Sequence, residues 1–295
     1  MKADKVRYLL ISGQATVLYG AATFSEDLDI WLCPQNANLQ RFVKALRTLR
    51  ARYYKLTPPL TLPYLRKGHG FHFTLLAEDR TDWYLDVMGV PPRAPVFNVA
   101  WRRSIRMKTP WGMVPVVSVP DLVELKKTQR LEDYAIISRL VVATMNRAGL
   151  KPSRRLARWA AQNIFSPALL TELIRQQPWV ATRLGRGLAG IRAFGSKIEK
   201  SEKPGLGLEQ RVEREMLARM AKYQAADRRY WRRIITELKS LRACGRLMPE
   251  GERMEGSGFA RQAPPERSAQ ARELRPGVPN RVRRKSLAPH SVAPG

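Results

Sequence analysis

The sequence predicts a mixed α/β (α+β) protein in which a small mixed sheet is followed by a helical domain and a disordered tail. Short apolar runs separated by polar turns fill the first half of the 295-residue chain. Apolar residues at helical spacing dominate the next hundred residues, and the last fifty contain few aliphatic or aromatic side chains. We therefore expect a sheet-containing domain over residues 1–150, a helical domain over 151–245 and a disordered basic tail over 246–295.

Five segments of the first half have the short apolar or alternating pattern of β-strands. Two of them are separated by the polar residues Glu78, Asp79 and Arg80, which predict a hairpin turn between them. The segment over 7–12 ends at Gly13. The five predicted strands are 7–12, 27–32, 70–76, 82–88 and 113–117.

Other segments repeat their apolar residues at the three- and four-residue spacing of a helix. Asn36 is a suitable N-cap for a helix that runs to about Tyr53, with an apolar stripe on one face. We expect two further helices, from Pro120 to Gln129 and from Leu131 to Asn146. Residues 14–20 are expected to form one or two helical turns.

The longest predicted helix runs from Glu209 to Arg242. Eight apolar or aromatic residues fall on one side of it, and eight basic residues occupy the other faces. Two interpretations stay open: a helix that presents a basic face to a substrate, and a core-packing helix whose charges are only solvated.

The net charge of the chain is +28, from 53 basic and 25 acidic residues, and the excess is spread along the sequence. It amounts to +10 over 1–150, +13 over 151–245 and +5 over 246–295. Such a balance favours a polyanionic partner, RNA or DNA, although an arginine-rich coding bias would give the same composition. Two isolated cysteines, no long apolar run and no secretion signal predict a cytoplasmic protein that does not enter a membrane.

The segment 11–32, ISGQATVLYGAATFSEDLDIWL, contains the most informative chemistry. Residues two apart on a strand point to the same side, so Asp27 and Asp29 are expected to converge while Leu28 faces the core. Two adjacent carboxylates repel each other unless a cation lies between them, and Mg²⁺ prefers oxygen ligands of this kind. Asp86, flanked by apolar residues in WYLDVM, is a third acid that needs a partner.

Ser12 and Gly13 lie where a predicted strand ends and a predicted helix begins. Backbone N–H groups at such a turn can hold phosphate, and glycine permits a close approach. Ser25 is expected either to contact phosphate or to cap the turn before Asp27. We assign neither His69 nor His72 a role in metal binding or catalysis.

These residues together resemble the nucleotidyltransferase (polymerase-beta-like) superfamily. Its pattern is a small turn, an Asp-x-Asp ten to fifteen residues later, and a lone Asp on a subsequent strand. The matching residues are Ser12-Gly13, Asp27-Leu28-Asp29 and Asp86, and the resemblance is strongest to AbiEii-type toxins and minimal bacterial nucleotidyltransferases. These relatives often have a helix with a Lys followed by Arg-x-Lys-Asp, which Lys126, Arg130 and Asp133 resemble.

The resemblance implies an enzyme that transfers a nucleoside monophosphate from an NTP to an acceptor hydroxyl. Asp27, Asp29 and Asp86 would bind Mg²⁺ or Mn²⁺, while Ser12, Gly13, Ser25 and Lys126 would contact the nucleotide. The basic composition favours RNA, such as a tRNA end, as acceptor, and a toxin role with an antitoxin partner. Small-molecule or protein acceptors, and a non-catalytic nucleic-acid-binding protein on the same scaffold, stay open.

Overall fold

A single mixed sheet organises the first half of the chain in the computed structural model, which describes residues 1, 3–76, 82–110, 112–149, 152–176, 179–180, 193, 196–197 and 206–254. The strand order is β3-β4-β5-β2-β1-β7-β6. Neighbouring strands are parallel at β2–β5 and β1–β7 and antiparallel elsewhere, which confirms the predicted mixed α/β class. The strands are β1 (Tyr8–Leu10), β2 (Leu28–Leu32), β3 (Arg52–Tyr53), β4 (Gly70–Leu76), β5 (Asp82–Met88), β6 (Ile105–Thr109) and β7 (Gly112–Val116).

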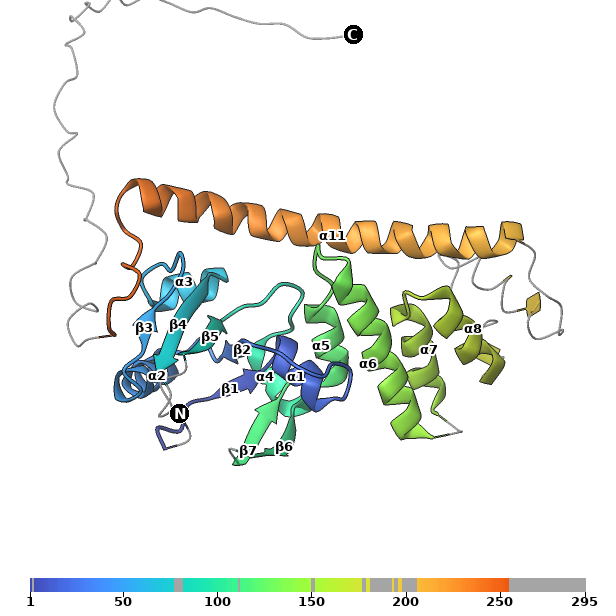
Figure 1. The fold of residues 1–295 in the computed structure, drawn as a ribbon, viewed down its shortest axis with the longest axis horizontal. Coiled ribbons are helices and arrows are strands. Elements are labelled where there is room, and N and C mark those ends of the chain that lie inside the picture. The colour runs from blue at the N-terminus through green and yellow to red at the C-terminus, as the bar shows by residue number, and fades with distance from the viewer. Residues whose placement is uncertain are drawn as a thin grey trace, which may run out of the picture. The chain divides into compact units, whose positions relative to one another are not determined.

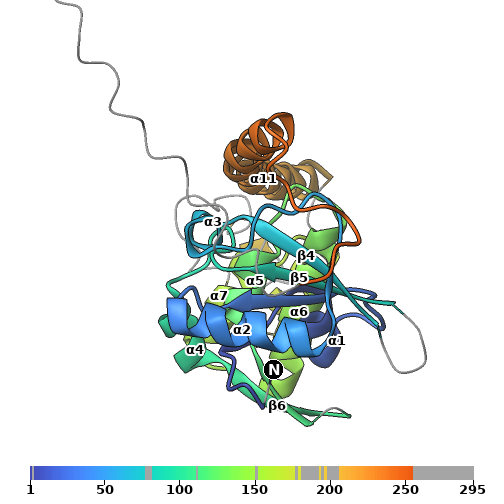
Figure 2. The same ribbon diagram turned by 90° about the vertical axis from the view of Figure 1, so that its left-hand side faces the viewer.

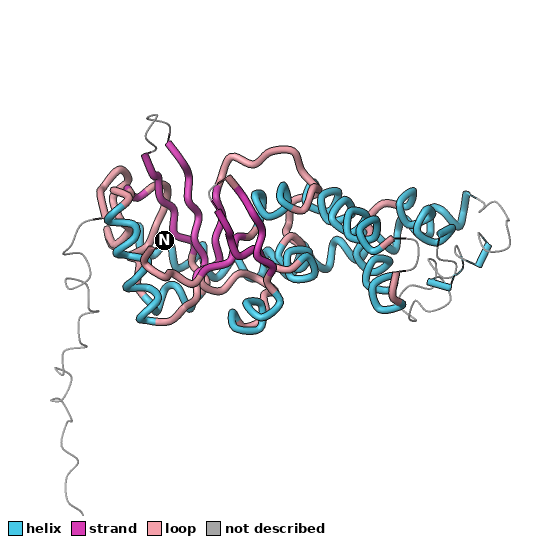
Figure 3. The backbone as a smooth tube through the Cα atoms, turned by 90° about the horizontal axis from the view of Figure 1, so that it is seen from below, coloured by secondary structure: helices cyan, strands magenta, loops and turns pink. Residues whose placement is uncertain are grey.

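Helices cover the sheet and then form the second half of the described chain (Figure 1). Seen from below, the strands lie together in the half of the chain that contains the N-terminus, and the other half consists of helices (Figure 3). The helices are α1 (Ser12–Leu18), α2 (Asn36–Thr48), α3 (Leu62–Lys67), α4 (Phe97–Arg103), α5 (Val119–Leu125), α6 (Glu132–Ala148), α7 (Arg154–Asn163), α8 (Pro167–Gln176) and α11 (Leu206–Ala243).

Two predicted helices end earlier than expected. The helix that begins at Asn36 stops at Thr48, because Arg50 adopts a left-handed backbone (φ 50°) and the next residues pair with β4 as the edge strand β3. The helix predicted over 120–129 ends at Leu125, after which Lys127 and Thr128 form a turn into α6. The strand β6 has no counterpart among the predicted strands, since Arg106 and Lys108 interrupt its apolar pattern.

The apolar face of α2 packs against one side of the sheet. Phe42 and Phe73 meet edge to face with ring centroids 6.3 Å apart, and both side chains are fully buried. In Figure 2, α2 lies on one side of the strands and α11 on the other. The opposite face of the sheet, which carries Asp29, is therefore the one turned away from α2.

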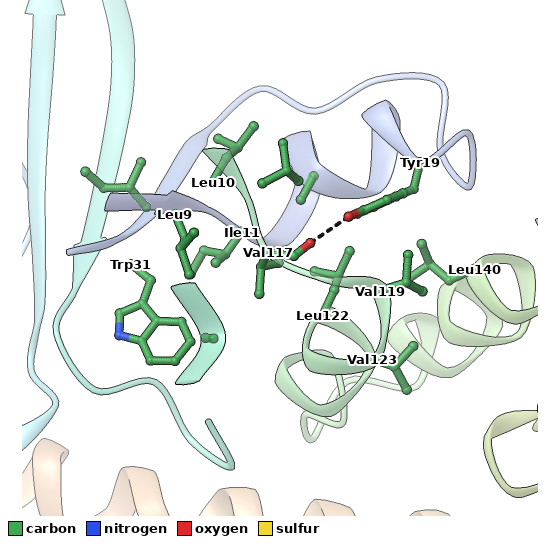
Figure 4. Close-up of a cluster of buried hydrophobic side chains, with 14 of the residues drawn as sticks. Leu9, Leu10, Ile11, Tyr19, Trp31, Val117, Val119, Leu122, Val123 and Leu140 are labelled. Carbon is green, nitrogen blue, oxygen red and sulfur yellow. Dashed lines mark hydrogen bonds between the residues drawn. The ribbon is translucent and has the colours of Figure 1, made fainter. Parts of the chain in front are cut away.

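A second group of buried side chains joins the sheet to the helical half (Figure 4). Leu9, Leu10 and Trp31 come from the sheet, while Leu122 and Leu140 come from α5 and α6. The Tyr19 hydroxyl donates a 2.8 Å hydrogen bond to the carbonyl of Val117 within this group. Because this core is continuous, residues Met1–Glu255 form one unit that includes both the predicted sheet domain and the predicted helical domain.

The helix α11 spans this unit lengthwise and is attached to it at several points (Figure 1). The Arg219 guanidinium donates to the carbonyl of Gln162 at the end of α7. Farther along, the Tyr230 hydroxyl donates to the carbonyls of Val90 and Gly68, and a Cβ atom on Gly68 would lie 2.0 Å from that hydroxyl. The absence of a side chain at this glycine therefore permits the contact. None of the helices in the described residues combines the length and apolarity needed to cross a membrane.

Residues 246–254, which the sequence analysis placed in the tail, follow the free edge of β3. Met248 and Met254 donate backbone hydrogen bonds to Thr57 and Ala51, and the Met254 side chain is buried. An edge strand leaves backbone donors and acceptors unpaired, so a short returning segment satisfies them without needing a large apolar side-chain set. Residues 255–295, the rest of the predicted tail, lie outside the described residues.

The attachment of α11 depends on a buried acid, which gives a first prediction. Asp227 is 1% exposed, accepts the backbone N–H of Gln129 at 3.1 Å and lies 3.5 Å from the Arg93 guanidinium. Asp227→Ala should lower the free energy of unfolding by about 3 kcal/mol, because it leaves Arg93 and a backbone donor without their partner. Urea denaturation would measure this loss. Glu213→Ala, at an exposed position of the same helix, should change stability by less than about 0.5 kcal/mol; an equal effect of both changes would contradict the assignment.

Candidate active site

Parallel pairing of β2 with β5 places two of the three predicted acids side by side. Asp29 and Asp86 are register partners on the adjacent strands. Partner residues on neighbouring strands project from the same face of a sheet. Asp27 directly precedes β2, and its charge acts on the Asp29 carboxyl. The structure therefore places Asp29 beside Asp86 on one face of the sheet, with Asp27 at the start of the same strand segment.

The Asp29 carboxyl has an unusual protonation equilibrium. Burial, followed by the charge of Asp86, raises its pKa to about 7, and Asp27 acts in the same direction. A hydrogen bond from the Ser12 side chain and the charge of Lys126 oppose the increase. Four other predicted site residues thus act on this one carboxyl group. A carboxyl group with a pKa near neutrality and other acids around it has too little positive charge nearby to stabilise its ionised form.

Ser12, Gly13 and Ser25 form a close-packed turn beside Asp29. Ser12 has a left-handed backbone (φ 55°) at the start of α1. A Cβ atom on Gly13 would lie 2.1 Å from the Ser25 hydroxyl oxygen, so only glycine allows these two segments to approach this closely. The Ser25 hydroxyl donates to the carbonyl of Asp27 at 3.3 Å, and the Gln14 amide donates to the carbonyl of Ser25. The turn before the Asp-x-Asp motif is held against α1 by these contacts.

Lys126 ends α5 and is buried rather than solvated, with 5% of its surface exposed. Its ammonium group lies 3.1 Å from Asp133, which also binds the Arg130 guanidinium at 3.2 Å and the Thr128 hydroxyl. Arg130 and Asp133 therefore form an ion pair in this turn. Because the charge of Lys126 also acts on Asp29, it connects the acid cluster to the turn between α5 and α6.

His72 belongs to the site although the sequence analysis gave it no role. Strand β4 pairs with β5 in a register that sets His72 opposite Asp86, and His72 Nδ1 lies 2.7 Å from Asp86 Oδ1. A usable signal was present in the sequence. The hairpin turn predicted at Glu78, Asp79 and Arg80 lies outside the described residues. His72 and Asp86 are each seven positions from Asp79, and residues equally distant from the centre of a hairpin pair with each other. His69, in contrast, is fully buried and lies 2.8 Å from Glu237 of α11.

The donor atoms at this site are of the kind that Mg²⁺ or Mn²⁺ prefers, namely several carboxylates and a hydroxyl. In the part of the chain that the structure describes, no three His, Cys, Asp or Glu side chains already surround a common point as a metal site. The Oδ1 atom of Asp86 is instead engaged by His72. A shared cation therefore requires Asp86 to use its other oxygen or to turn away from the imidazole. The metal-binding roles of Asp27, Asp29 and Asp86 stay predictions.

The raised pKa of Asp29 predicts a pH-dependent cost in stability. Between pH 4 and 7 the unfolded chain loses the Asp29 proton while the folded chain keeps it, so this group lowers stability as the pH rises. The full shift corresponds to on the order of 4 kcal/mol. Asp29→Asn should raise the free energy of unfolding at pH 8 by at least about 1 kcal/mol, with the gain disappearing toward pH 3.5. Metal-free urea titrations at both pH values would measure it, and a gain independent of pH would be inconsistent with a strained carboxyl.

No protein-family model matches this chain, and a search of curated proteins finds no match. What the site does must therefore be inferred from the placement of its own side chains.

Proposed function

We propose that this protein transfers a nucleoside monophosphate from a nucleoside triphosphate to an acceptor hydroxyl and releases pyrophosphate. The observation that supports this most directly is the register of β2 and β5, which sets Asp29 beside Asp86 with Asp27 acting on the same carboxyl. A bound Mg²⁺ or Mn²⁺ would neutralise charge on the triphosphate and lower the pKa of the acceptor hydroxyl. Such a cation would also relieve the repulsion among the three acids.

The three acids would serve two cation positions in this reaction. Asp27 and Asp29, from one chain segment, would bind the cation that accompanies the triphosphate. Asp86 enters from the neighbouring strand and, together with Asp27 and Asp29, would hold the second cation near the acceptor. His72 would position the Asp86 carboxyl through its 2.7 Å contact, because a hydrogen bond to one oxygen fixes the direction of the other.

The turn of Ser12, Gly13 and Ser25 would position the phosphates. Its backbone approaches closely because Gly13 has no side chain, and Ser12 already contacts Asp29. Lys126 would act mainly through charge, since its ammonium group is buried and bound to Asp133. Most of the rate acceleration would come from alignment and charge neutralisation rather than from a protein acid or base.

RNA is the acceptor class that the charge distribution favours. Between Lys222 and Arg242 of α11, seven basic side chains are exposed, while the two acids in this stretch are buried or ion-paired. Such a surface attracts a phosphodiester backbone. A cationic small molecule would be repelled by it. A tRNA-like end, and with it a toxin role, fits this surface best among the acceptors considered.

A labelling experiment tests the proposed reaction. The protein is incubated with each α-³²P-labelled NTP, Mg²⁺ or Mn²⁺ and total RNA, and the labelled macromolecule is identified. Label should enter RNA, and both Asp29→Asn and Asp86→Asn should reduce the rate by about 100-fold or more. Glu26→Gln is the matched control, because Glu26 is an exposed acid next to Asp27 and should leave the rate unchanged.

Other outcomes would point elsewhere. Label in protein or in a small molecule would keep the transfer reaction but replace the acceptor. A wild-type protein that binds RNA in a salt-sensitive way and transfers no label, and whose binding survives Asp27→Ala with Asp29→Ala, would favour a non-catalytic nucleic-acid-binding protein. The exposed basic surface of α11 is the observation that supports this second function.

A further inference from the structure

A surface cavity at α7 lies outside the acid cluster and has an unusual lining. Its volume is about 460 Å³. Basic and aromatic side chains form its wall, and no acid contributes to it among the described residues. The lining residues are Arg154, Arg155, Arg158, Trp159, Gln162 and Trp179.

The cations of this cavity come from the first turns of one helix. Arg154, Arg155 and Arg158 are all exposed, and α7 contains no acidic residue to neutralise them. Arg155 and Arg158 are three positions apart and so are neighbours on the helix surface. Guanidinium groups in such an arrangement bind phosphate through paired N–H donors.

The aromatic side chains suggest what accompanies the phosphate. Trp159 is half-buried in the cavity wall, and the Arg154 guanidinium carbon lies 6.0 Å from the centre of the Trp179 ring. Inorganic phosphate or another simple polyanion would not use the indole rings, and an apolar ligand would not use the three arginines. A nucleotide uses both kinds of side chain, because its base stacks on an aromatic ring while its phosphates pair with arginine.

The cavity is joined to the acid cluster by α11. Arg219 of α11 donates to the backbone carbonyl of Gln162, a residue of the cavity wall. Eight residues later, Asp227 accepts the N–H of Gln129, in the turn that follows Lys126. These two points are ~12 Å apart along the helix axis. Beyond Asp227 the exposed arginines of α11 continue alongside the sheet.

We propose that the cavity at α7 binds an unpaired nucleotide of a single-stranded RNA, with Trp159 stacking on the base and Arg155 and Arg158 contacting phosphate. The bound strand continues over the basic side of α11. This inference concerns binding, and it holds whether or not the acid cluster transfers a nucleotide. In combination with the proposed transfer reaction, the cavity is an anchoring point that holds the acceptor RNA at a distance from its reacting end.

Fluorescence anisotropy with a labelled, unstructured RNA 12-mer at 150 mM salt tests this proposal. Trp159→Leu retains an apolar side chain against the core but removes the stacking surface, and should weaken binding about ten-fold. Trp159→Phe should restore most of the affinity. The pair Arg155→Gln with Arg158→Gln should also weaken binding about ten-fold. The matched control changes two exposed cations of α2, Lys44→Gln with Arg47→Gln, and should alter the affinity by less than two-fold.

Inorganic polyphosphate is a second probe that separates charge from base recognition. The affinity for polyphosphate should fall in the double variant Arg155→Gln with Arg158→Gln but not in Trp159→Leu.

Circular dichroism would show whether Trp159→Leu folds. If it folds and binds RNA as tightly as the wild type, the proposal of a nucleotide site is wrong. Equal losses in the α7 and α2 pairs would also overturn it, in favour of non-specific attraction to a basic surface; this comparison stands even if Trp159→Leu fails to fold. The anisotropy is measured without NTP or divalent cation, so that failure of transfer and failure of this site are distinguishable.

Discussion

The parallel pairing of β2 with β5 is the constraint on which the rest of this structure depends. It sets Asp29 opposite Asp86, and burial together with their mutual repulsion raises the pKa of Asp29 to about 7. A fold that retains this arrangement accepts a cost on the order of 4 kcal/mol at neutral pH. The Trp31 indole of β2 donates a hydrogen bond to the carbonyl of Gly89, which directly follows β5, and so links the same two strands two to three residues after the acids. The packing of the sheet thus maintains a site whose electrostatics favour a bound cation.

Charge is distributed in opposite ways on the two sides of α11. From Lys222 to Arg242 the two acids of this helix face inward, where Asp227 meets Arg93 and Glu237 meets Lys67 and His69. On the exposed side of this stretch, every charged side chain is basic. One helix therefore fixes the sheet to the helical half and also provides a continuous cationic surface. Core packing of this helix is confirmed, because Val212, Met216 and Ile234 are buried, while the binding of a substrate to its basic outer face stays a prediction.

The sequence was sufficient to predict that Asp29 and Asp86 lie in strands, but not which side chains surround them. The alternation of DLDIWL and WYLDVM was enough to place Asp29 and Asp86 in strands, because side-chain direction repeats every two residues. The pairing of those strands with each other and with β4 is a long-range property, so His72 was missed. The burial of Lys126 was not predicted for a similar reason, since it depends on Asp133 and on the packing of α6. The short edge strand β3 and the returning segment 246–254 have weak local patterns and are stabilised mainly by backbone pairing.

The central claim is that Asp27, Asp29 and Asp86 share a divalent cation. Mn²⁺ binding, followed by the loss of the free-ion electron paramagnetic resonance signal in titrations at pH 6 and pH 8, tests it most directly. Because a cation must displace the proton of a carboxyl group whose pKa is about 7, the wild type should bind Mn²⁺ about ten-fold more tightly at pH 8. Asp29→Asn should bind weakly at both pH values. Equal Mn²⁺ affinity in the wild type and Asp29→Asn would contradict the claim.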